Sequence, residues 1–174
     1  TGLTLADNLI QWKGAQHVPR RDYFPGNEAT MNRQLAKFEI AYSREVSRSA
    51  QRARLLATLA GLSSRQRMSF GQAVAEITKN ALSHAGGGVV EFWIVDREGT
   101  QLIEIVVRDQ GPGIEDVDFP DREIAAKPSG RPSGIARSRD SVERFSIDST
   151  PNQGTVVRLG QSVPGGVLLS EDVL

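Results

Sequence analysis

The chain has 174 residues, enough for one domain that buries roughly 70% of its unfolded surface. Lysine and arginine together number 21 and equal aspartate plus glutamate, so the charge balance predicts neither nucleic acid nor a membrane as a partner. The lack of cysteine excludes a disulfide framework and a thiolate metal site, and without a long apolar run or a signal-peptide pattern we expect a cytoplasmic protein.

The N-terminal part of the chain is the least regular. Residues 1–34 show no clear period, and we interpret them as an extension or linker ahead of the domain. Alternating apolar and polar residues from Ala36 to Tyr42 then predict a strand. A helix should follow, with Ser43 as its N-cap and an apolar stripe that ends at a C-cap, Gly61.

A second helix, capped by Ser63 or Ser64, has its apolar residues on one stripe: Phe70, Ala73, Val74, Ile77 and Ala81. Glu76, Asn80 and His84 recur every fourth residue and form a polar row beside that stripe. Such a row can line a cleft, but it also fits an ordinary amphipathic helix, and this segment alone leaves both open. The glycines at 86–88 should end the helix and leave a backbone that a ligand can approach closely.

The second half of the chain is rich in strands. Segments 89–95 and 101–107 alternate clearly and predict an antiparallel hairpin. Residues 115–133 hold three prolines and several charges, and a loop of this length is typically a functional lid or a disordered segment. Beyond it we expect one helix and two strands, over residues 134–142, 144–147 and 155–159. This order predicts an α+β fold, a two-layer α/β sandwich with helices packed on one face of a mixed, mostly antiparallel sheet.

A glycine-rich segment follows the second hairpin strand, where Asp109 precedes Gly111 and Gly113. An aspartate fixed at a strand end can accept a hydrogen bond from an exocyclic amine, and the glycines let backbone approach a flat ring. The same letters also fit a simple turn after a strand, so this segment alone does not decide the matter.

Taken together, three segments resemble the motifs of the GHKL ATPase superfamily, which includes gyrase, Hsp90, MutL and the histidine kinases. They are EITKNALSHAGGG at 76–88 (the N box), DQGPGI at 109–114 (the first glycine box) and TPNQGTVVRL at 150–159 (the last box). Within the superfamily, the sequence is most similar to the anti-sigma-factor and RsbT-like serine/threonine kinases. The resemblance implies a Bergerat-type ATP-binding domain over 35–160, followed by a tail, 161–174.

The resemblance also implies roles for single residues. Asn80 would ligate Mg²⁺ through its side-chain carbonyl, and Glu76 would be the general base on the attacking hydroxyl of water or of a protein serine or threonine. Asp109 would bind the adenine amino group, with Thr155 supporting it directly or through water. The remaining residues implied at the nucleotide are His84, Gly111, Gly113, Ile114, Gly134 and Ile135.

The second glycine box departs from the family pattern. The family usually has G-x-G-L-G or a near relative, whose backbone N–H groups face the phosphates, whereas this chain has GRPSGI at 130–135. Pro132 stands where a glycine is expected and has no N–H to donate. The departure calls efficient phosphoryl transfer into question more than adenine binding, because the missing N–H would face the phosphates. Positive charge could come instead from Arg131, Arg137 and Arg139.

The resemblance therefore implies ATP and Mg²⁺ as cofactors, and a serine/threonine kinase that phosphorylates a regulatory protein such as a STAS-domain anti-sigma antagonist. A homodimer is compatible with this reading of the family. Two alternatives stay open. One is the ATP-binding domain of a histidine kinase, whose phosphoacceptor would lie outside the chain because neither His17 nor His84 has the required setting. The other is a catalytically weak, nucleotide-gated module that holds a protein partner.

Overall fold

The structure is a computed structural model that describes residues 32–97, 99–114 and 134–166. Its elements in chain order are β1 (Asn32–Ile40), α2 (Ser43–Leu59), α3 (Ser64–Ala85), β2 (Gly88–Arg97), β3 (Thr100–Asp109), α5 (Gly134–Asp140), β4 (Arg144–Thr150), β5 (Gly154–Ser162) and a 3-10 turn (Pro164–Gly166). The sheet begins and ends slightly outside the predicted domain bounds of 35 and 160. Residues 1–31 of the predicted extension, the segment 115–133 and residues 167–174 of the predicted tail lie outside the described residues, while residues 32–34 belong to β1.

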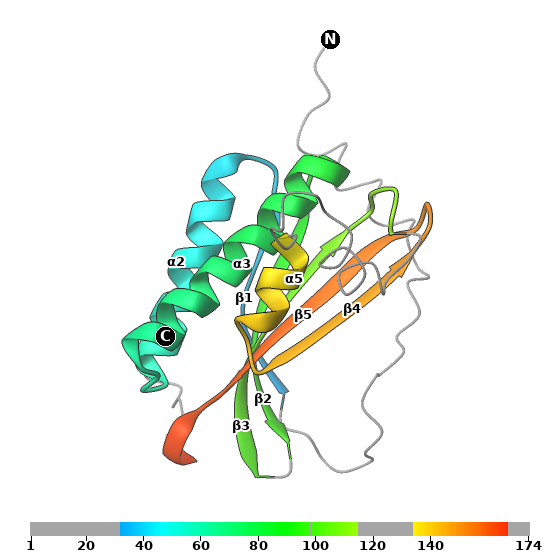
Figure 1. The fold of residues 1–174 in the computed structure, drawn as a ribbon. Coiled ribbons are helices and arrows are strands. Elements are labelled where there is room, and N and C mark those ends of the chain that lie inside the picture. The colour runs from blue at the N-terminus through cyan, green and yellow to red at the C-terminus, as the bar shows by residue number, and fades with distance from the viewer. Residues whose placement is uncertain (1–31, 98, 115–133, 167–174) are drawn as a thin grey trace, which may run out of the picture.

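The five strands form one sheet in the order β1-β2-β3-β5-β4, and all four pairings are antiparallel. Helices α2, α3 and α5 lie on one face of this sheet (Figure 1). The predicted two-layer α+β fold is thus confirmed, but the described sheet is entirely antiparallel and not mixed. None of the helices in these ranges combines the length and the apolar character needed to cross a lipid bilayer.

The start of α2 differs from the prediction by one residue. β1 ends at Ile40, so Tyr42 is not part of the strand; it is the N-cap of α2, a place that we had assigned to Ser43. The reason is the side chain of Glu45, whose Oε2 accepts a hydrogen bond from the Tyr42 N–H at 2.7 Å. This carboxylate satisfies a donor at the positive end of the helix and fixes the first turn there.

Helix α3 begins and ends where the sequence predicts. The Oγ of Ser63 accepts a hydrogen bond from the Gln66 N–H, and Gln66 Oε1 accepts one from the Ser63 N–H at 3.0 Å, which is a reciprocal cap. At the other end, Gly86 has a left-handed backbone with φ 73°, and the Gly87 N–H donates to the carbonyl of Ala81. These caps set the orientation of the Glu76 row.

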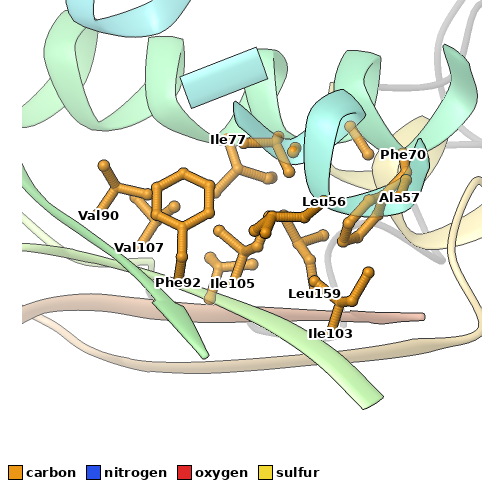
Figure 2. Packing of buried hydrophobic residues seen from close by; sticks show 14 of the residues in the cluster. Leu56, Ala57, Phe70, Ile77, Val90, Phe92, Ile103, Ile105, Val107 and Leu159 are labelled. Atoms are coloured by element: carbon orange, nitrogen blue, oxygen red, sulfur yellow. The ribbon is translucent and has the colours of Figure 1, made fainter. Parts of the chain in front are cut away.

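The core lies between the helices and the sheet. Figure 2 shows the helix residues Leu56, Ala57, Phe70 and Ile77 packed against side chains of β2, β3 and β5, among them Phe92, Ile105 and Leu159. All members of the predicted α3 stripe are at most 2% exposed. Because this apolar stripe is buried against the sheet, the neighbouring polar row of α3 is held at the edge of the helix layer.

The last elements differ in length from the prediction. Helix α5 ends at Asp140 instead of residue 142, and a turn follows it. Strands β4 and β5 extend to Thr150 and Ser162, beyond the predicted ends at 147 and 159. The added residues are polar ones or glycine, and they continue the ladder because each has a partner in the neighbouring strand.

Candidate functional site

The Glu76 and Asn80 side chains face the start of α5. A Cβ built on Gly134 would lie 2.9 Å from Glu76 Oε2 and 3.9 Å from Asn80 Nδ2. Helix α5 therefore begins directly against both side chains, and the lack of a side chain at 134 leaves room for the carboxylate.

Helix α5 is held in this position by its packing on α3. Ala136 is fully buried, and Ile135 packs against the hydrophobic core. The Ser138 hydroxyl lies 2.8 Å from the carbonyl oxygen of Gly134 and 3.4 Å from that of Ala73, which ties α5 to the backbone of α3. The predicted site residue Ile135 thus contributes its side chain to the core.

Glu76 also meets a cation from α5. Arg137 Nη2 lies 3.1 Å from Glu76 Oε1, and the two side chains are 49% and 27% exposed. Next to this ion pair is a cavity of about 280 Å³, bordered by Gln72, Ala73 and Glu76 of α3 and by α5 with Ser141 just after it. The Glu76 carboxylate is therefore open to a ligand from one side and covered by α5 on the other.

The side chain of Asn80 fits the role of a metal ligand. It is half-buried, and its amide has no hydrogen-bonding partner within the described ranges. In the same ranges no group of three His, Asp or Glu side chains could hold a metal by itself. A single amide oxygen suits Mg²⁺ only if water or phosphate oxygens complete the coordination, because magnesium usually takes few protein ligands.

Asp109 ends β3 beside the last turn of α3. Its Oδ1 accepts a hydrogen bond from the Gly111 N–H at 2.9 Å. Burial raises the pKa of the Asp109 carboxyl above its ordinary value, while the N–H groups of Gly111 and Thr155 and the nearby His84 act in the opposite direction. His84 lies four residues after Asn80 on α3, so the polar row of this helix extends from Glu76 to the end of β3.

Thr155 is the register partner of Asp109 in β5 and is 8% exposed. Its Oγ1 lies 2.8 Å from the Oγ of Ser149, which accepts a hydrogen bond from the Ile114 N–H at 2.8 Å. Ser149 thus links the end of the first glycine box to the threonine expected at the adenine.

The first glycine box is clamped between α3 and the β4–β5 turn. A Cβ on Gly111 would lie 2.7 Å from the Cβ of Ala85, and one on Gly113, whose φ is +72°, would overlap the backbone carbonyl of Thr150. In addition, the Asn152 N–H donates to the carbonyl of Pro112 at 2.7 Å. The glycines are therefore required here by close backbone packing.

The predicted site residues form two groups along the same edge of α3. One group consists of Glu76, Asn80 and Gly134. The other consists of His84, Asp109, Gly111, and Thr155 with its partner Ser149. Ser149 was not predicted as a site residue, because its signal in the sequence is only its place opposite Thr155 in the second hairpin. It named Arg137 only as a source of charge, and Arg131 and Pro132 lie outside the described residues.

Comparison with known proteins adds three findings. The family model described as histidine kinase-, DNA gyrase B- and HSP90-like ATPase matches residues 66–164. The serine/threonine-protein kinase RsbT of Bacillus subtilis (strain 168) is 23% identical over 132 residues, which cover 76% of this chain and 95% of that protein. A chain in the crystal structure of the SiaB–SiaC complex from Pseudomonas aeruginosa is 13% identical with a TM-score of 0.43, over 94% of this chain and 100% of that one.

Proposed function

The chain belongs to the family of histidine kinase-, DNA gyrase B- and HSP90-like ATPases, and on that premise we propose that it transfers the γ-phosphate of ATP to a serine or threonine of a regulatory protein. The similarity to RsbT, a serine/threonine-protein kinase, supports this branch of the family. The partner would be a signalling regulator such as a STAS-domain protein, as the resemblance to RsbT-like kinases implies. Phosphorylation would then decide which protein that regulator binds.

One observation carries the proposal: the Glu76 carboxylate and the Asn80 amide lie one helical turn apart and both face the start of α5. A turn of α-helix separates them by about 6 Å along the axis, which suits one group acting on the metal and phosphates and the other on the attacking hydroxyl. Glu76 also borders the cavity between α3 and α5, from which an acceptor hydroxyl could reach it.

The adenine would bind at the other end of the polar row. The Asp109 carboxylate would accept a hydrogen bond from the exocyclic amine. The Gly111 N–H donates to Oδ1 of the same carboxylate and so fixes its orientation. A hydrogen bond to a charged acceptor contributes about 1.5–3 kcal/mol. Thr155 would assist from β5, held in place by Ser149.

At the phosphate end, Asn80 would offer its side-chain oxygen to the metal. Mg²⁺, when bound, neutralises charge on the phosphates and aligns them. Glu76 would accept the proton of the attacking serine or threonine hydroxyl, which requires its carboxylate to be released from Arg137. Gly134 would let the backbone at the start of α5 lie close to the nucleotide.

The test is incubation of the protein with Mg-ATP and candidate partner proteins, followed by identification of the phosphorylated residue. We expect phosphoserine or phosphothreonine on the partner. Glu76→Gln should keep nucleotide binding and lose transfer, because an amide cannot accept the proton. Glu39→Gln, which removes an exposed carboxylate on β1, is the matched control and should transfer normally.

Other outcomes separate the alternatives. Phosphohistidine on a partner would favour the histidine kinase reading, and tight ATP-dependent partner binding without transfer would favour a nucleotide-gated binding module. Undiminished transfer by Glu76→Gln would exclude this residue as the base.

A further inference from the structure

We propose that Arg137 is the nucleotide-sensing residue of this site: its guanidinium pairs with Glu76 when no nucleotide is bound and moves to the terminal phosphate of ATP when it is. The inference rests on the proposed function, because it assigns a new role within the same site. It concerns how the chain distinguishes ATP from ADP and when the carboxylate becomes available.

Arg137 lies at the middle of α5, and its guanidinium reaches Glu76 across the α3–α5 boundary at 3.1 Å. Gly134, at the start of the same helix, borders Glu76 and Asn80 together. A cation on Glu76 is therefore within about one helical turn of the amide proposed to hold the metal, and the metal must itself contact the phosphates.

The contacts of Arg137 with Glu76 and with a terminal phosphate differ in strength. The Arg137 side chain is 49% exposed and that of Glu76 is 27% exposed, so their ion pair is screened by water. Such pairs shift an equilibrium by roughly fivefold at most. A terminal phosphate carries more negative charge and offers several oxygens in the forked geometry that guanidinium binds best. The exchange from carboxylate to phosphate is therefore favourable.

Two other arginines, one on α5 and one on β3, pair with carboxylates other than Glu76. Arg139 lies 3.6 Å from Asp140 on its own helix, and Arg108 lies 3.6 Å from Glu91, on the sheet face opposite the helices. The sequence also has a proline at 132, where family members usually present a backbone N–H to the phosphates. A guanidinium with five N–H donors can replace that missing donor.

The exchange couples two events. While Arg137 holds Oε1 of Glu76 and the start of α5 lies against Oε2, both carboxylate oxygens are in contact with α5. When the guanidinium moves to the phosphate, Oε1 is released on the side of the α3–α5 cavity. The base is thus more available, by about fivefold at most, when a terminal phosphate is present to be transferred.

The first experiment measures binding of ATP, ADP and adenosine by calorimetry in the presence of Mg²⁺. Arg137→Gln should weaken ATP binding about ten- to a hundredfold, weaken ADP binding much less, and leave adenosine binding unchanged. The unchanged adenosine affinity also shows that the variant is folded. Arg65→Gln is the matched control, since it removes an arginine that lies roughly 16 Å from Glu76 along the axis of α3. This variant should bind all three ligands as the wild type does.

The second experiment tests the exchange itself with a double-mutant cycle. Glu76→Gln should strengthen ATP binding because it removes the carboxylate that competes with the phosphate for Arg137, and this gain should disappear in the Glu76→Gln/Arg137→Gln double variant. A gain that persists without Arg137 would mean simple charge repulsion between Glu76 and the phosphates, and it would overturn the exchange.

Different results would overturn the proposed function and the role of Arg137. If the wild type binds no ATP, the proposed function is wrong and the role of Arg137 falls with it. If the wild type binds ATP but Arg137→Gln keeps the same ratio of ATP to ADP affinity, the sensing role is wrong while the proposed function stands.

Discussion

Replacing Gly113 by alanine tests the clamp on the first glycine box. Gly113 has φ +72°, and a Cβ there would overlap the carbonyl oxygen of Thr150 and lie 2.8 Å from its carbon. A left-handed backbone costs a residue with a side chain about 1–2 kcal/mol. The overlap adds about 1–3 kcal/mol, because the opposing atoms are backbone and cannot rotate away. We therefore expect Gly113→Ala to lower the free energy of unfolding by about 2–5 kcal/mol.

Gly99→Ala provides the matched control. Gly99 has nearly the same backbone angle, φ +76°, but a Cβ there has no atom within 4 Å, so this variant should lose only the backbone part of the energy. Urea unfolding of both variants, with equal slopes as a check on two-state behaviour, measures the difference. Gly113→Ala should also lose nucleotide binding, whereas Gly99→Ala should keep it. Equal losses of stability in the two variants would refute the close packing of Gly113 on the β4–β5 turn.

Three further expectations concern the adenine end. Asp109→Asn should abolish the rise in melting temperature that ATP causes in the wild type; an unchanged rise would remove Asp109 from the site. Burial raises the pKa of Asp109, so the folded, nucleotide-free protein holds the Asp109 proton more tightly than the unfolded chain does. The stability that Asp109 contributes is therefore fully present below the unfolded-state pKa of about 3.9 and is lost as the pH rises through the folded-state pKa. Between these two pKa values the melting temperature of Asp109→Asn should rise relative to that of the wild type, and a constant difference would contradict this expectation. Ser149→Ala should cost about 1–3 kcal/mol and weaken ATP binding, since it removes the hydroxyl that contacts the Thr155 hydroxyl and accepts from the Ile114 N–H, while Ser146→Ala on the opposite face of β4 should do neither.

The fold was predictable where local and tertiary preferences agree. Helix α3 has a cap at Ser63, an apolar stripe and a left-handed glycine at 86, and its prediction is confirmed at both ends. At α2 the local pattern was ambiguous, because Ser43 is a good N-cap by type, yet the reach of the Glu45 carboxylate selects Tyr42. Strand ends depend on the partner strand, and residues such as Ser162 have no apolar pattern to reveal their place in the ladder.

The candidate site was predictable only within single elements. The four-residue spacing on α3 already places Glu76 and Asn80 in one row, and the sequence after β3 already places Asp109 beside its glycines. The contact of Arg137 with Glu76 joins residues 61 positions apart, and it depends on how α5 packs against α3, for which no local pattern exists. The role of Ser149 similarly depends on the register of β4 against β5.

The two ends of the site are built from different kinds of contact, and this difference has a consequence for binding. The proposed adenine end is fixed by backbone packing and short hydrogen bonds, including the Asn152 N–H on the carbonyl of Pro112. Such contacts do not rearrange without unfolding the turn, so this end is preorganised for a flat ring. The proposed phosphate end depends on a half-exposed ion pair, which water and salt screen and which a stronger anion can displace. Adenine should therefore bind to a rigid surface, while the response to the number of phosphates arises entirely where α5 meets α3.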